Sequence, residues 1–190
     1  MSRDRILDAA RHVCETHGVA SLTMRRIAAQ AGLTAPAIYR HFSGKEAVLE
    51  ALADRANERF AGYLARVAGS GSLDALRRLL DRVLDFAIED PTSYDILFFS
   101  RDRTAAHLDP EARRSPNFRT LLRQVEACQA ARRLRSDHDA ITLAVTLWAL
   151  VHGMIALHVQ GRFGRSAGRL RVRARTALEL LLTGLATRQP

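Results

Sequence analysis

The chain has little of what would mark an enzyme, a secreted protein or a metalloprotein. Its two cysteines, Cys14 and Cys128, lie far apart in sequence and predict no disulfide framework. It contains no G-x-S-x-G elbow, phosphate-binding loop, dinucleotide fingerprint or H-E-x-x-H metal helix. Cys14 and His17 have a spacing that metal ligands use, but no second pair follows to complete a site. We therefore expect neither catalysis, nor a cofactor, nor a bound metal.

Long apolar runs and targeting segments are scarce as well. Residues 140–159 form the most apolar stretch, but Thr146, His152, Gly153 and His158 interrupt it, so we expect no membrane span. The first residues follow an amphipathic pattern and offer no continuous apolar core of a signal peptide. With 190 residues, of which 47% are hydrophobic, the chain can bury a sizeable core. These features predict a globular, cytoplasmic protein.

Residues 22–46 contain three helix-start signals in quick succession. Thr23 and Thr34 each occupy a capping position, and each is flanked by apolar residues at the spacing of a hydrophobic staple. Ser43 precedes Glu46 by three residues, which is the spacing of a capping box. The sequence therefore predicts three helices that begin close together.

The connection between the first two of these helices is too short for anything but a sharp turn. Gly32 lies in this turn, where we expect a positive φ that glycine adopts without a steric clash. Two short helices joined in this way form a helix-turn-helix. The second, roughly residues 35–41, has Pro36 in its first turn and Ile38 facing inward. Small residues come first on this helix, which suits insertion into the major groove of DNA, with phosphates within reach of Tyr39, His41 and Lys45.

These residues closely resemble the DNA-binding domain of the tetracycline-repressor (TetR) family of bacterial transcription regulators. The resemblance covers residues 6–49 and rests on several motifs in fixed order: ILDAA at 6–10, Gly18, TMRRIA at 23–28, AGLT at 31–34, AIYRHF at 37–42, and Lys45-Glu46. The chain departs from the family pattern at Cys14, where a Phe is usual. Because Cys can serve as a small buried hydrophobe, this affects packing in the first helix and not the binding surface.

The resemblance implies a role in DNA binding for particular residues. It implies phosphate contacts from Thr23, Tyr39, His41 and Lys45, and base or groove contacts from Arg25, Ala35, Pro36, Ala37 and Arg40. Thr34, as the cap of the second helix, completes the candidate set. Taken singly, each residue has an ordinary alternative, such as a core aromatic ring, a solvated charge or a residue near a cap.

The rest of the chain is predicted to be helical, so the fold class is all-α. An N-terminal three-helix domain with a helix-turn-helix, residues 1–48, is joined by a long helix to a C-terminal helical domain, residues 49–190. Residues 69–72, with the sequence GSGS, should end the long helix. Residues 100–116 lose periodicity and are predicted to form a surface loop.

The last two predicted helices, about residues 139–161 and 168–185, have apolar residues on much more than one stripe. One interpretation is that one face of each lines the monomer core and another meets the same helices of a second copy, as the TetR resemblance also implies. The alternative is a fully buried helix of a monomer. A homodimer with one motif per chain would read a palindromic site on double-stranded DNA.

Trp148, His152 and Gly153 form a W-x-x-x-H-G run that resembles the C-terminal ligand-domain signature of one TetR subgroup. Ordinary core packing is the alternative for this run. The candidate ligand-binding residues share an apolar or weakly polar character, which favours a mainly apolar small-molecule effector; they are Phe86, Tyr94, Phe98, Phe99, Phe118, Leu122, Cys128, Trp148 and His152.

The net charge of +9 lies mostly outside the helix-turn-helix, since residues 100–190 contain 16 basic and 7 acidic side chains. The basic run at 165–175 is interpreted as a solvated face or loop and not as a second DNA site. The hypothesis drawn from the sequence is a dimeric repressor that an effector releases from DNA. The alternatives are a DNA-binding regulator without an effector, and a small helical enzyme or interaction module.

Overall fold

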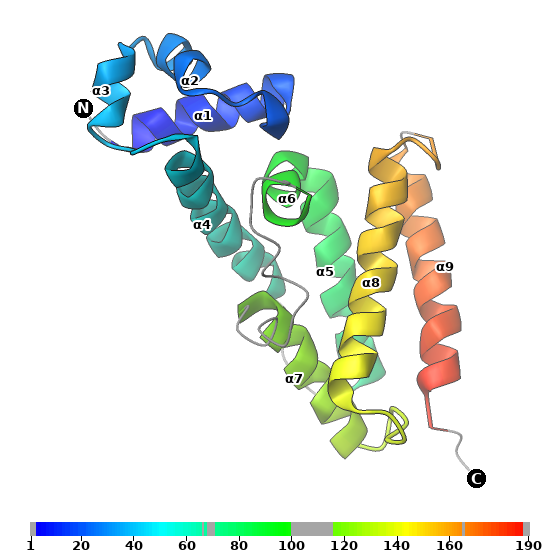
Figure 1. Ribbon diagram of the computed structural model, residues 1–190. Helices are drawn as coiled ribbons and strands as arrows, with labels where there is room; N and C mark the ends of the chain where they lie inside the picture. The colour runs from blue at the N-terminus through cyan, green and yellow to red at the C-terminus, as the bar shows by residue number, and fades with distance from the viewer. Residues whose placement is uncertain (1–2, 66, 68–70, 100–115, 165, 188–190) are drawn as a thin grey trace. The chain divides into compact units, whose positions relative to one another are not determined.

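A computed structural model describes residues 3–65, 67, 71–99, 116–164 and 166–187 of the chain (Figure 1). In these ranges every regular element is a helix, and the one β-type contact is an isolated bridge between Leu134 and Ala186. The predicted all-α fold class is confirmed. The helices are α1 (Arg3–His17), the short 3-10 helix η1 (Val19–Ser21), α2 (Met24–Ala31), α3 (Ala35–Tyr39), α4 (Lys45–Leu64), α5 (Leu73–Glu89), α6 (Pro91–Phe98), α7 (Pro116–Ala130), α8 (Ala140–Val159) and α9 (Ala167–Leu185).

The helices form two compact units, which we call the head unit and the body unit. The head unit contains the chain up to Arg59 and the segment that begins at Asp90, so it includes α6. The body unit contains Phe60–Glu89 and helices α7 to α9. The chain therefore leaves the head unit inside α4 and returns to it just before α6. The division at residue 48 remains a prediction, and the predicted loop at 100–115 and Gly69-Ser70 lie outside the described residues.

The core of the head unit is built by the residues that the staple pattern selects. Leu22, Ile27 and Ile38 are almost completely buried, and α1 contributes Ile6 and Ala10 to the same core. Burying a side chain of this size stabilises a fold by about 1.5 to 3 kcal/mol. The apolar staple residues therefore fix how α2 and α3 enter the head.

Two of the three predicted capping devices differ from the structure. Thr23 caps α2 as predicted, because its Oγ1 accepts a hydrogen bond from the Arg26 backbone N at 3.2 Å. Thr34 occupies the N-cap position of α3, but its side chain makes no capping bond, since Pro36 already lacks one of the N–H groups that need a partner. The helix start that was predicted at Ser43 was wrong, because α4 begins two residues later, at Lys45.

In the body unit, α8 packs against α5, α7 and α9, and Figure 1 shows α8 and α9 side by side. Asp139 caps α8 through a 2.8 Å hydrogen bond that its Oδ1 accepts from the Thr142 backbone N. By length and composition alone α8 is long and apolar enough to cross a membrane. The polar residues within 140–159 are therefore not sufficient to exclude a span, contrary to the expectation from the sequence. The contacts of α8 with three helices are those of a helix in a bundle.

Residues 167–175 of the basic run lie in α9 and not in a loop. Arg175 pairs with Asp81 of α5 at 3.0 Å, and Arg171 pairs with Asp85 of the same helix. Farther along α9 the polarity reverses, since Glu179 accepts a hydrogen bond from Arg77 of α5 at 2.6 Å. Two of the arginines in the run thus hold α9 against α5.

Candidate nucleic-acid interface and aromatic cluster

The turn between α2 and α3 is fixed by backbone chemistry. Gly32 has a φ of 64°, and the N–H of Leu33 donates to the carbonyl of Ala28 at 2.9 Å, which is a Schellman-type end for α2. Arg5 of α1 adds a bond that the sequence analysis missed, because its Nη2 donates to the Ala31 carbonyl at 3.0 Å. The helix-turn-helix is therefore held both by its own turn and by α1.

Most of the predicted DNA-binding side chains are exposed on the head unit. Tyr39, at the end of α3, is 54% exposed, an unusual state for a large ring. Lys45 is half-buried, and Ala37 is the one that packs into the head, with 8% exposure. The side chain of Ala35 lies outside the described set. The remaining candidates are exposed: Thr23, Arg25, Thr34, Pro36, Arg40 and His41.

A buried carboxylate, that of Asp90, connects α1, α4 and α6 within the head unit. The Asp90 side chain is 2% exposed and accepts hydrogen bonds from Arg11 Nη2 at 2.9 Å and from the Ser93 backbone N at 3.2 Å. Arg59 of α4 pairs with its other oxygen at 2.8 Å. Burial alone would raise the pKa of Asp90, but the hydrogen bonds from Arg11 and Ser93 hold it below the ordinary value. Asp90 therefore remains charged in the fold.

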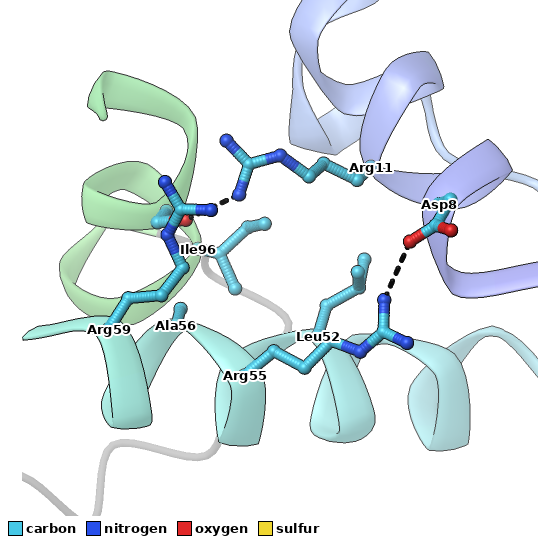
Figure 2. Close-up of a pocket in the computed structure, with 8 residues that line it drawn as sticks. Asp8, Arg11, Leu52, Arg55, Ala56, Arg59 and Ile96 are labelled. Atoms are coloured by element: carbon cyan, nitrogen blue, oxygen red, sulfur yellow. Dashed lines mark hydrogen bonds and ion pairs between the residues drawn. The ribbon is translucent and has the colours of Figure 1, made fainter. Parts of the chain in front are cut away.

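Arg11, Arg59 and Ser93 also border a small pocket of about 120 Å³ within the head unit. Figure 2 shows Arg11 of α1 and Arg55 and Arg59 of α4 around this pocket, with Ile96 of α6 among its apolar walls. Arg55 donates to Asp8 at 2.8 Å, so α1 and α4 are joined at a second point. The volume is well below the roughly 300 Å³ at which drug-sized ligand sites begin. We therefore regard the pocket as the polar seam between α1, α4 and α6.

Four aromatic rings and one imidazole gather in the body unit. Trp148 lies with its ring centroid 4.3 Å from that of His152, 6.0 Å from that of Phe118 and 6.4 Å from that of Phe60. Phe60 in turn contacts Phe86, at 4.9 Å between centroids. Burial lowers the pKa of His152 to about 3, so its imidazole is neutral at cellular pH. We call Phe60, Phe86, Phe118, Trp148 and His152 the aromatic cluster.

The structure brings together only part of the predicted ligand-binding set. Phe86, Phe118, Trp148 and His152 meet in the aromatic cluster, whereas Tyr94 and its ring neighbours Phe98 and Phe99 belong to the head unit. Phe60 was missed, although the apolar periodicity of α4 includes it.

Two predicted ligand-binding residues of α7 lie outside the aromatic cluster. Cys128 is completely buried and accepts a hydrogen bond from Gln124. Leu122 lines a pocket of about 330 Å³ together with Pro116, Arg119 and Arg123. Neither this pocket nor the one in the head unit is lined by Trp148 or His152.

Metal binding finds no geometric support in the part of the chain that the structure describes. No group of three or more His, Cys, Asp or Glu side chains is placed there to hold an ion. Burial raises the pKa of Cys14 to about 11, so this thiol stays protonated and packs as a hydrophobe.

Comparison with known proteins identifies both parts of the chain. Residues 6–52 match the family described as bacterial regulatory proteins, tetR family, and residues 76–183 match the tetracyclin repressor-like C-terminal domain. The nucleoid occlusion factor SlmA of Photobacterium profundum is 29% identical over 173 residues, covering 85% of each chain. The transcriptional repressor AcnR of Corynebacterium efficiens is 29% identical over 162 residues, covering 82% of this chain and 80% of its own. A solved SmeT–triclosan complex is 26% identical with a TM-score of 0.68, covering 97% of this chain and 91% of its own.

Proposed function

Because the chain belongs to the TetR family of DNA-binding transcriptional regulators, we propose that it is a repressor which binds a palindromic operator as a homodimer and leaves it when a small molecule binds the body unit. The observation that carries the proposal is the helix-turn-helix, whose second helix, α3, ends at the exposed Tyr39 and is followed by the exposed Arg40 and His41. AcnR, a relative of similar length, is a repressor. We place this activity in the cytoplasm, where the operator would be.

The proposed DNA surface uses two kinds of contact. The exposed Pro36 and the start of α3 would enter the major groove, with Arg25 and Arg40 reaching base edges. Thr23, Tyr39, His41 and Lys45 would contact phosphates, which fix register and carry no sequence information. These side chains lie on one unit and all are exposed except that of Lys45, which is half-buried, and this supports a shared DNA surface.

The proposed homodimer rests on apolar side chains that the body unit leaves in solvent. Val145 on α8 is 44% exposed, and Val172 and Leu180 on α9 are 66% and 73% exposed. A methyl group added at Gly153 of α8 would meet no atom within 4 Å, so that surface is open for a neighbouring helix. Exposed apolar surface of this kind, on adjacent helices, is typical of a self-complementary two-fold interface.

The proposed effector site is the aromatic cluster. A neutral His152 beside Trp148 offers one polar group among apolar rings, which is the composition of a site for a mainly apolar ligand. The related SmeT was solved with triclosan, a molecule of that character. Ligand and operator are then linked, because a ligand that prefers the conformation with poor DNA affinity must weaken DNA binding.

A regulator without an effector is the second candidate, and one observation favours it. The rings of the cluster already contact one another, and neither of the two pockets described above is lined by Trp148. An effector would therefore have to separate these rings. The effector prediction below distinguishes the two candidates.

The function is tested by selecting bound sequences from random double-stranded DNA with the full chain. We expect enrichment of a palindrome whose half-site centres lie on about the same face of the duplex. Enrichment of a single, non-repeated half-site bound by a monomer would contradict the dimeric proposal. Failure to enrich any sequence would favour an interaction module.

Lys45→Ala and Tyr39→Phe should weaken binding to specific and non-specific DNA alike, because both residues are assigned to phosphates. For Lys45→Ala the slope of log K against log salt concentration should fall by about one, since one ionic contact and its released counterion are lost. Titrations at several salt concentrations measure both effects. A variant that loses base preference at an unchanged slope would contradict the assignment of Lys45.

Trp148→Ala should abolish release from the operator by an effector while leaving operator affinity nearly intact. Triclosan is the first probe, and an effective ligand should weaken wild-type operator binding about 5- to 150-fold. Truncating Trp148 costs about 3 to 5 kcal/mol, so folding and dimerisation must be checked first. Trp148→Phe keeps an aromatic ring in the cluster and serves as the control. If a ligand releases the alanine variant at the wild-type concentration, Trp148 is core and the proposed site is wrong.

A further inference from the structure

An ion pair within the head unit joins the two points at which the chain crosses between the units. Arg59 is the last head-unit residue before the chain enters the body unit, and Asp90 is the first after it returns. These two residues form an ion pair at 2.8 Å, and Arg11 of α1 joins them through Asp90 at 2.9 Å. On the body side, Tyr63 donates to Glu89 at 2.7 Å, one residue before the return crossing.

We propose that Asp90, with Arg11 and Arg59, is a positioning clasp that sets the affinity of the head unit for DNA although none of the three residues touches DNA. The clasp joins α1, the long helix α4 and the first turn of α6. It rests on the proposed DNA-binding function of the head and assigns that function a control point outside α2 and α3.

The physical case begins with the cost of taking the clasp apart. A carboxylate that is 2% exposed and pairs with two guanidinium groups is stable only while both partners stay in place. Removing one partner of a buried pair leaves a charge without compensation, so the remaining helices must shift or admit water. The adjacent pocket of about 120 Å³ provides room for such a shift. Opening the clasp would therefore release α6 from α1.

A change at α1 reaches the DNA surface through packing. Among the described helices, α1 and α2 form the most extensive contact. In addition, Arg5 of α1 donates a hydrogen bond to the carbonyl of Ala31 at the end of α2. If the clasp keeps α1 ordered, the helix-turn-helix meets DNA already in its bound geometry. Preorganisation of this kind strengthens binding because less ordering remains to be done on association.

Asp90→Asn is the decisive substitution, because asparagine still caps a helix while the charge is lost. We expect operator affinity to fall about 5- to 150-fold, the usual range for coupling between sites, with the enriched sequence and the salt slope unchanged. Arg59→Gln should act in the same direction with a smaller effect, since Arg59 is 53% exposed. Arg59→Lys retains the charge and should restore most of the affinity. Asp137→Asn, which breaks an exposed ion pair with Arg135 in the body unit, is the control and should leave affinity unchanged.

Affinities are measured on folded protein of checked oligomeric state, with DNA selected by the wild type. If Asp90→Asn does not fold, the comparison of Arg59→Gln with Arg59→Lys decides. Wild-type affinity in the folded Asp90→Asn or Arg59→Gln protein would overturn the clasp and leave the DNA-binding proposal intact. A salt slope lowered by about one in Arg59→Gln would also overturn the clasp, because it would reveal that Arg59 contacts a phosphate directly. Failure of the wild type to enrich DNA would count against the proposed function itself.

Discussion

Leu180→Glu should make the protein monomeric and weaken operator binding about 100- to 10,000-fold, the gain that two linked binding modules provide over one. Leu180 is 73% exposed on α9, so a glutamate there is tolerated by the folded chain. In the proposed dimer the same side chain is buried against a second copy, where an unpaired carboxylate is strongly destabilising. The loss of affinity therefore arises from the interface and not from the head.

Analytical ultracentrifugation and operator titration measure the two parts of this prediction. Ala130→Glu, which adds the same charge to an exposed position at the end of α7, is the matched control. It should remain dimeric and keep operator affinity. A Leu180→Glu protein that stays dimeric at low micromolar concentration would place the interface elsewhere.

Gly71→Ala should lower the free energy of unfolding by about 2 to 4 kcal/mol, from left-handed backbone strain and overpacking combined. Gly71 has a φ of 61°, and a Cβ there would lie 2.8 Å from the carbonyl oxygen of Ala127. That oxygen belongs to the backbone of α7 and cannot turn aside as a flexible side chain would. The close approach of this turn to α7 is reinforced by Gln124, whose amide donates to the Ser72 carbonyl at 3.4 Å.

Gly62→Ala provides the control for this substitution. Gly62 lies in α4, and a Cβ there would meet no atom within 4 Å. The same added methyl should therefore stabilise the protein by about 0.5 to 1 kcal/mol, because alanine favours helix over glycine. Denaturant titrations of both variants give the comparison. Equal effects at the two positions would mean that Ala127 does not constrain Gly71.

The parts of the fold that were predicted from the sequence are those set by residues close together in the chain. Thr23 caps α2 and Gly32 adopts the left-handed conformation, because each depends on neighbours within a few positions. The start of α4 was misplaced, because Ser43 offers a good local cap pattern whereas the helix begins at Lys45. Helix ends of this kind are decided by small differences between adjacent positions.

The candidate site could be predicted only in part, because its remaining contacts join distant segments. Asp90 has the local pattern of a helix stop before proline, and nothing near it in sequence indicates Arg11 or Arg59 as partners. The aromatic residues posed the opposite difficulty. Their number predicted one cluster, whereas Tyr94 belongs to the head unit and Phe86 to the body unit. Composition shows that rings are available but not which of them share a core.

If the proposed homodimer forms through the exposed apolar side chains of α8 and α9, the thermal stability of this regulator depends on its own concentration. If association covers Val145, Val172 and Leu180, dilution draws the equilibrium toward single chains that expose them. The melting temperature is then a property of the solution as well as of the fold, and it rises as protein is added. In a cell the same mass action makes the abundance of the regulator a determinant of how much of it survives as folded, operator-competent protein.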